Sequence, residues 1–333
     1  MTESRSAVAM PGASFWVRAS VLILLALSVA ALSLFSGSSD VTPIQVLTAL
    51  WGHAGDAAQS VIMEVRLPRL LAAFGVGSVL ALAGVLLQAL FRNPLADPYV
   101  LGVSGGAAVC ALLAMVFGAA LWTTQIAAIL GALGAVVLVY ALGRGGGNAR
   151  LLLTGVVFAS TCGAIVSVML SVADSSRVRG MVFWLAGDLD WATYPHASWI
   201  AAVIAVIAGV VLARPLNVLA AGEIRARSVG LDFDVWRALV FAIAATLTAI
   251  AVVSAGTVGF VGLIVPHMVR LFFRTTDHRV VAPAAALLGG TLLTAADLAA
   301  RTIASPRQLP VGAIMALVGA PLFIALLRRS ASR

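Results

Sequence analysis

Uncharged stretches long enough to cross a membrane recur along the whole chain, and they constrain its fold more than any other feature. Most reach the ~17–25 residues that a spanning helix needs. Stretches of that length favour helices over the shorter alternating strands of a membrane barrel. The sequence therefore predicts an all-α, polytopic integral membrane protein with about ten transmembrane helices. The candidate spans are Val17–Phe35, Leu70–Phe91, Val100–Phe117, Leu121–Leu142, Leu151–Val172, Thr193–Ala213, Ala238–Ala255, Val258–Val269, Val280–Ala296 and Leu309–Leu327.

The composition supports this class and excludes others. Only 10% of the residues are charged, and the mean hydropathy is +1.08. An ordinary soluble domain is roughly 25% charged, so too few polar side chains remain here to cover a soluble surface. Disorder would require low hydrophobicity. Arginines that flank membrane spans explain the net charge of +8 without a nucleic-acid partner.

The residue types that carry catalysis are nearly absent from the sequence. All 21 basic residues are arginine, which excludes a standard phosphate-binding loop and a lysine Schiff base. The four histidines are scattered without metal-ligand spacing, and Cys110 and Cys162 lie alone in apolar runs. We therefore expect no catalytic site, no metal site and no cofactor bound by this chain.

The predicted spans also suggest an orientation and a duplication. Placing both termini in the cytoplasm puts most arginines on that side, as the positive-inside rule requires. The span Val258–Val269 is short and contains Pro266, which predicts a broken or partly inserted helix. The segment from Arg66 to Gly84 resembles that from Arg237 to Gly256, which indicates a weak inverted repeat.

Residues 214–234 form the most polar segment on the predicted cytoplasmic side and read as two short helices. Glu223 and Arg227 are four residues apart in the favourable order for an ion pair. Gly230 suits a position just beyond a helix, and Asp232 suits an N-cap. The segment is a candidate docking surface for a motor subunit; a plain solvated connector is the equally weighted alternative.

Three arginines on the predicted outer side are candidate binding residues. Arg66 and Arg69 open the second span, at the positive end of a helix dipole and on the side that arginines avoid. Residues that oppose two local preferences are expected to bind something acidic, and membrane anchoring is the alternative. Arg301 follows Asp297 by four residues, so an intrahelical ion pair is its alternative reading.

Two glycine-rich segments have a packing interpretation and a functional one. Small residues at 256, 259 and 262 permit close helix packing and, alternatively, line a substrate path. The turn from Gly143 to Asn148 is expected to be a flexible inner turn, with a gate as the alternative.

Several long motifs, taken together, resemble the permease family of binding-protein-dependent ABC importers for iron-siderophores, haem and vitamin B12, the type II importers. They run in family order from residue 66 to the C-terminus. The motifs are Arg66-Leu67-Pro68-Arg69, Gln88-Ala89-Leu90-Phe91-Arg92-Asn93-Pro94-Leu95-Ala96-Asp97-Pro98, Leu101-Gly102-Val103-Ser104-Gly105-Gly106, Phe183-Trp184-Leu185-Ala186-Gly187, Gly222-Glu223 with Ala226 and Gly230, Gly256-Thr257-Val258-Gly259-Phe260-Val261-Gly262-Leu263-Ile264-Val265-Pro266-His267, Thr276-Asp277-His278-Arg279, Ala296-Asp297 with Arg301, and Leu309-Pro310-Val311-Gly312.

This resemblance implies a single transmembrane permease domain over residues 1–333 in the bacterial inner membrane, with both termini cytoplasmic. It implies a homodimer with the path between its subunits, two cytoplasmic ATPase subunits that bind ATP and magnesium, and one periplasmic substrate-binding protein. The cargo is a bulky metal chelate, either a ferric siderophore or haem, with vitamin B12 (cobalamin) as the alternative. Gly187-Asp188-Leu189-Asp190 departs from the commoner Gly-Ser-Leu pattern, which argues against a plain ferric-siderophore permease.

The resemblance also implies roles for particular residues. Docking of the binding protein is expected at Arg66, Arg69 and Arg301. Coupling to the ATPase is expected at Ala221, Gly222, Glu223, Arg225, Ala226 and Gly230. The translocation path and gate are expected at Asn148, Ala149, Arg177, Arg179, Met181, Gly259 and Gly262.

Two other classes of function compete with an importer permease. An ion-coupled transporter usually keeps an ionisable side chain near mid-membrane, and the predicted span centres hold none. A membrane-embedded enzyme needs a cluster of catalytic side chains, which the sequence does not offer.

Overall fold

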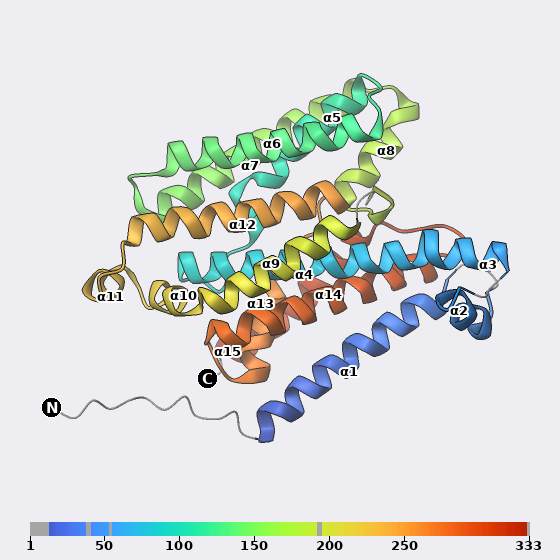
Figure 1. Cartoon of the computed structure of the whole chain (residues 1–333). Helices are drawn as coiled ribbons and strands as arrows, with labels where there is room; N and C mark the ends of the chain where they lie inside the picture. The colour runs from blue at the N-terminus through green and yellow to red at the C-terminus, as the bar shows by residue number, and fades with distance from the viewer. Residues whose placement is uncertain (1–12, 38–40, 53–54, 192–194, 332–333) are drawn as a thin grey trace.

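A computed structural model describes residues 13–37, 41–52, 55–191 and 195–331, and the described chain is built from helices (Figure 1). The elements of the first half are α1 (Ala13–Phe35), α2 (Pro43–Leu50), α3 (Asp56–Ser60), the π-helical turn η1 (Val61–Arg66), α4 (Leu67–Phe91), the 3-10 turn η2 (Pro98–Leu101), α5 (Val103–Val116), α6 (Leu121–Gly143) and α7 (Gly147–Val172). The second half holds α8 (Ser175–Ala186), the 3-10 turn η3 (Leu189–Trp191), α9 (Pro195–Val211), α10 (Ala213–Ala220), α11 (Glu223–Ser228), α12 (Phe233–Ala255), α13 (Val261–Phe273), α14 (His278–Thr302) and α15 (Val311–Ala331).

The long apolar helices confirm a polytopic all-α membrane protein. Within the described ranges, six helices are long and apolar enough to cross a bilayer, and α9 with α10 makes a seventh span, bent by 70°, if the pair is counted as one. The helices α5, α13 and the described part of α15 are apolar but shorter. Each predicted stretch matches one of these helices, while the total of ten spans stays a prediction.

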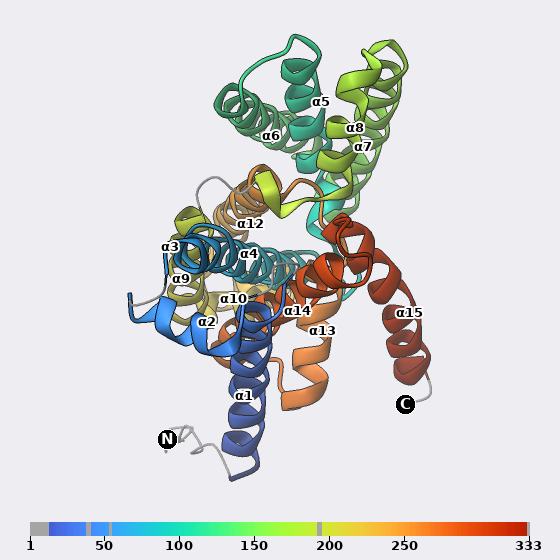
Figure 2. The same ribbon diagram turned by 90° about the vertical axis from the view of Figure 1, so that its right-hand side faces the viewer.

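The helix α4 forms the centre of the bundle. It is buried along almost its whole length and contacts α9, α12, α13 and α14 (Figure 2). Glycines allow this approach, because a Cβ at Gly77 would collide with the carbonyl of Gly289, and one at Gly84 with the carbonyl of Gly262. Small residues at crossing points let helix backbones pack closely in a membrane. Gly262 therefore serves packing in this fold rather than lining an open path.

The chain is interrupted between α12 and α13, whereas the short helix α13 itself continues through Pro266, where the sequence suggested a broken helix. The chain breaks between Ala255 and Val261, where Gly256 and Phe260 take positive φ values of 65° and 71°. Pro266 lies inside α13 itself, so the break precedes the proline and depends on Gly256. A residue with φ > 0 is costly unless it is glycine, which explains why a glycine begins the break.

The two ends of the bundle carry different elements (Figure 1). We call the end that holds α2, α3 and η1 the outer end, and the end that holds α10 and α11 the inner end. These names follow the orientation that the arginine distribution predicts. The helices α5 to α8 form an upper layer that α12 joins to the rest, and α1 packs along α14 on the opposite side (Figure 2).

Candidate functional site

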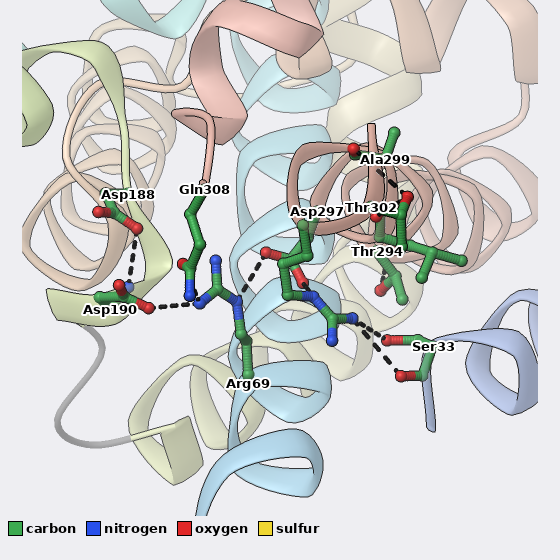
Figure 3. A network of polar contacts seen from close by, with 12 residues as sticks. Ser33, Arg69, Asp188, Asp190, Thr294, Asp297, Ala299, Thr302 and Gln308 are labelled. Carbon is green, nitrogen blue, oxygen red and sulfur yellow. Dashed lines mark hydrogen bonds and ion pairs between the residues drawn. The ribbon is translucent and has the colours of Figure 1, made fainter. Parts of the chain in front are cut away.

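Arg69 is the centre of a polar network at the outer end (Figure 3). Its Nε donates to Asp297 Oδ1 at 2.9 Å, and its Nη1 donates to Gln308 Oε1 at 2.9 Å. The same Nη1 forms a short ion pair with Asp190. Arg69 is only 8% exposed and Asp297 is fully buried. The network thus joins the start of α4, the end of α14, η3 and the loop before α15.

The other two candidate docking arginines hold the C-terminal end of α1. Arg301 Nε donates to Asp297 Oδ2 at 2.9 Å, and its Nη2 donates to Ser33 Oγ at 2.9 Å. Arg66 Nη1 donates to the carbonyl of Leu34 at 2.7 Å. The last carbonyls of a helix lack partners in their own helix and carry a partial negative charge. Both arginines therefore act as C-terminal caps supplied from other segments.

The structure places all three predicted docking arginines together but inside the protein surface. Arg66, Arg69 and Arg301 are 3%, 8% and 9% exposed. The intrahelical pair of Arg301 with Asp297, considered above as an alternative, is present. The network contains partners that sequence analysis did not find, because they come from distant segments: Ser33, Asp190 and Gln308. The docking role itself stays a prediction.

A cavity of about 700 Å³ opens beside this network between α5, α6, α8 and the loop before α15. Its polar lining includes Arg179, Asp188, Asp190 and Gln308. Burial raises the pKa of the Asp188 carboxyl, which accepts a hydrogen bond from the Asp190 backbone N–H at 3.0 Å. The cavity therefore presents both signs of charge at the outer end.

The predicted path residues on α8 take three different places. Arg177 donates to the carbonyl of Val116 and so caps the end of α5. The guanidinium of Arg179 lies 5.7 Å from the ring centre of Phe183, a cation–π distance. Met181 is fully buried in the core of this conformation, and its role in the path stays a prediction.

The segment from α10 to α11 forms the tip of the inner end (Figure 1). Of the predicted coupling residues, Gly222 and Ala226 are buried, and the others are exposed: Ala221, Glu223, Arg225 and Gly230. Ile224, which sequence analysis did not select, is 88% exposed. Single exposed apolar side chains are common on protein surfaces, so Ile224 is part of the tip's exposed surface and does not by itself identify an interface.

Polar contacts tie this segment to the neighbouring helices. Asn217 on α10 donates through Nδ2 to Asp277 Oδ1 at 2.9 Å and accepts from the His278 backbone N–H at 3.1 Å. Partial burial raises the pKa of Asp277, but hydrogen bonds from Asn217 and the Arg279 N–H outweigh it and hold the pKa below its usual range. Arg227 pairs with Glu223 at 3.1 Å and with Asp234 at 3.0 Å.

The comparisons with known proteins agree with this architecture over nearly the whole chain. The model of the FecCD transport family matches residues 23–329. The chain belongs to the FecCD transport family. It is therefore a multi-pass permease of the type II ABC importer class.

Two curated relatives of this FecCD permease show the range of the family. The cobalamin import system permease BtuC of Halobacterium salinarum is 43% identical over 279 residues, covering 82% of this chain and 74% of the relative. The hemin transport system permease HmuU of Yersinia pestis is 38% identical over 292 residues, covering 84% and 87%. A solved structure described as an inward-facing, metal-chelate type ABC transporter is 32% identical, with a TM-score of 0.83 over 94% of this chain and 99% of that one.

The predicted gate of this FecCD permease lies at the inner end, in the turn between α6 and α7. Gly145 and Gly147 take positive φ values of 89° and 71° there, and Ala149 is exposed. The side chain of Asn148 lies outside the part of the chain that the structure describes. Gly259, predicted for the path, faces open space, since a Cβ there would meet no atom within 4 Å.

The helix α7 carries a stripe of exposed hydroxyls that sequence analysis overlooked. Ser160, Ser167 and Ser171 lie on one face at helical spacing and are exposed. Each hydroxyl donates to a carbonyl of its own helix, as Ser167 does to Gly163 at 3.0 Å. The neighbouring helix α6 instead exposes apolar side chains such as Ile129, Leu133 and Val137. The face of α7 is mixed, since Leu153, Val157 and Val168 are exposed beside the serines.

Metal-binding groups were not found in the described residues. No group of three or more His, Cys, Asp or Glu side chains there has the geometry to hold an ion.

Proposed function

We propose that the chain is the permease subunit of a binding-protein-dependent importer that moves a bulky metal chelate across the bacterial inner membrane. The observation that carries this proposal is the exposed α10–α11 tip, where the side chain of Ile224 is open to contact by a partner. The chain also has no lysine for a phosphate-binding loop, so ATP hydrolysis needs another subunit. We expect this chain to bind no cofactor, and ATP with magnesium to bind the separate ATPase.

The cargo is proposed from the relatives. The names of the two relatives above give cobalamin and hemin, each a large ring that holds a metal ion. A metal chelate of this kind is our proposal for the present chain, with haem or a ferric siderophore as one arm of the test and cobalamin as the other.

The inner end is proposed to receive two ATPase subunits. Glu223, Arg225 and Ile224 form the exposed surface of the tip, while buried Gly222 and Ala226 seat the tip on the bundle. Asn217 binds α14 through Asp277 and His278. A movement of the tip is thereby passed to the long helix α14 through these hydrogen bonds.

The outer end is proposed to receive one periplasmic binding protein, with Arg66, Arg69 and Arg301 as the positive groups of the docking site. Their charges attract a partner with acidic surface groups even though their side chains are mostly buried, because electrostatic steering acts over about 8–10 Å at physiological salt. Both termini are proposed to be cytoplasmic, on the side of α10 and α11.

We further propose a homodimer whose path runs along α7. The helices α7, α8 and α15 lie toward one side of the bundle in the end-on view (Figure 2). The exposed serines of α7 are the observation that supports a path along this helix, although apolar side chains such as Leu153 and Val168 are exposed beside them. Arg179 and the open space beside Gly259 are proposed to border this path.

Uptake by proteoliposomes that contain the permease and its ATPase tests this function. With the substrate-binding protein outside and ATP inside, we expect uptake of haem or cobalamin that stops when either ATP or the binding protein is omitted. Uptake that collapses with a protonophore while ATP is maintained would identify an ion-coupled transporter instead. Because this chain supplies no ATPase site, the permease alone should hydrolyse no ATP.

A further inference from the structure

The two carboxylates that hold Arg69 differ sharply in their access to solvent. Asp297 is fully buried, whereas the side chain of Asp190 is 55% exposed. Gln308, which accepts from the same Nη1 as Asp190, is also exposed. One side of the Arg69 guanidinium is therefore fixed in the protein, and the other side faces groups that solvent can reach (Figure 3).

Two carboxylates form ion pairs with the two arginines Arg69 and Arg301, and Asp190 is one of them. Asp297 shares its single negative charge between two positive groups, because its Oδ1 accepts from Arg69 and its Oδ2 accepts from Arg301. The exposed carboxylate of Asp190 supplies the second negative charge on Arg69. Arg69 keeps Asp297 on its Nε, so a carboxylate on Nη1 adds to the stability of the buried charge without being its sole partner. The energetics do not require that this carboxylate belong to the same chain.

The outer cavity gives a second carboxylate a way in. Asp190 and Gln308 both line this space of about 700 Å³, which is large enough for the side chain of a glutamate or aspartate. The backbone of Asp190 is fixed, since its N–H donates to Asp188 and the Asp188 N–H donates to the Ala255 carbonyl at 2.9 Å. The side chain of Asp190 is thus the movable part of the pair.

We propose that Asp190 is a substitute ligand for Arg69, and that an acidic side chain of the docking protein enters the outer cavity and replaces it. This inference rests on the proposed docking of a binding protein at the outer end. The exchange swaps one carboxylate for another on the same guanidinium, and Asp297 remains on Nε while Nη1 changes partner. It also explains how a buried Arg69 can recognise an acidic partner, because the partner's side chain reaches it through the outer cavity.

Competition by Asp190 lowers the apparent affinity of the partner. If Asp190 occupies Arg69 about nine-tenths of the time, the docking-competent state is about one-tenth of the population and the apparent affinity falls roughly tenfold. The substitution Asp190→Asn keeps the shape and an amide oxygen that still accepts from Arg69, but it removes the competing charge. We therefore expect D190N to bind the substrate-binding protein roughly tenfold more tightly than wild type.

A matched variant separates exchange from a general charge effect. Asp174 on the same outer end is exposed and pairs only loosely with Arg177, at 4.0 Å. Asp174→Asn removes the same formal charge without touching Arg69. We expect no gain in affinity from D174N, and equal gains in both variants would reduce the effect to long-range electrostatics and overturn the proposal.

The measurement is the affinity of the importer's own chelate-loaded substrate-binding protein for the permease–ATPase complex in nanodiscs. The melting temperature of each variant is recorded alongside, so that a folding defect is recognised. Unchanged affinity for D190N would overturn the exchange. Weaker affinity would also overturn it, because it would indicate that Asp190 itself binds a basic group of the partner. If wild type itself fails to bind the protein, the proposed docking function fails, which is a separate result.

Discussion

The outer and inner ends of this permease both carry ionic groups, but they are organised in opposite ways. The outer network draws Ser33, Arg69, Asp190, Asp297 and Gln308 from segments that are far apart in the sequence, and its central carboxylate is fully buried. At the inner end, the ion pairs connect residues within one short, exposed stretch. Charge at the outer end is part of what holds the bundle together. The ion pairs at the inner end lie on an exposed surface, and Asp277, which accepts from Asn217, is an inner-end carboxylate that joins distant segments.

The largest effect is expected for Asp297→Asn. This change leaves Arg69 and Arg301 buried without their shared carboxylate, and breaking a buried ion pair typically costs ~3–5 kcal/mol. The chain should unfold at a clearly lower temperature in detergent. Asp190→Asn is the matched control. Asp190 also pairs with Arg69, but its side chain is exposed, so its loss should lower the melting temperature much less. Equal melting of Asp297→Asn and wild type would show that the outer network does not hold the helices.

A smaller loss of stability is expected for Gly222→Ala. Gly222 has φ 110° and ψ 164°, a region that is essentially open only to glycine, and strain there costs ~1–3 kcal/mol. A Cβ would also approach Arg92 Nη1 to 2.9 Å. Retention of the ATPase during purification should fall along with the melting temperature. In the Gly222→Ala/Arg92→Ala double variant, we expect no recovery of the melting temperature, because the backbone strain remains. Full recovery would instead trace the defect to the contact with the Arg92 side chain.

Ile224→Asp should weaken the inner interface while leaving the fold intact. A central apolar contact in a protein interface is commonly worth at least ~1.4 kcal/mol, or about tenfold in affinity. The test is the dissociation constant of the ATPase from permease in nanodiscs. Ile44→Asp changes a similarly exposed isoleucine on α2 at the outer end and should leave ATPase binding unchanged. Identical ATPase affinity for Ile224→Asp and wild type would remove the tip from the coupling surface.

The smallest effect is expected for Arg227→Ala. Pairing with Glu223 and Asp234 raises the pKa of Arg227, but the group is fully exposed and water screens its ion pairs. We expect no measurable change in the melting temperature. A drop comparable to that of Asp297→Asn would show that the two ends are not organised differently after all.

Local features of the fold were predictable from the sequence, and features that depend on distant segments were not. The spans and the helix pair of residues 214–234 follow from local composition and capping residues, whereas the break before α13 lies at Gly256 and not at Pro266, where it was expected. The clustering of Arg66, Arg69 and Arg301 followed from the family resemblance. Their burial did not, because it depends on Ser33, Leu34, Asp190 and Gln308, which approach only when the bundle folds. The burial of Met181 was not predictable for the same reason, since a residue near the predicted mouth can still turn inward.

The stripe of hydroxyls on α7 has a consequence for how long a cargo would stay beside it. Ser160, Ser167 and Ser171 already donate their protons to carbonyls of their own helix. A passing molecule therefore meets oxygen lone pairs but few free donors along this stripe. Conduction requires sites weak enough to leave as well as favourable enough to enter. If the proposed path runs along α7, the stripe offers a rigid cargo few free donors and the apolar side chains beside it, such as Leu153 and Val168, offer none, so a short residence time is expected there.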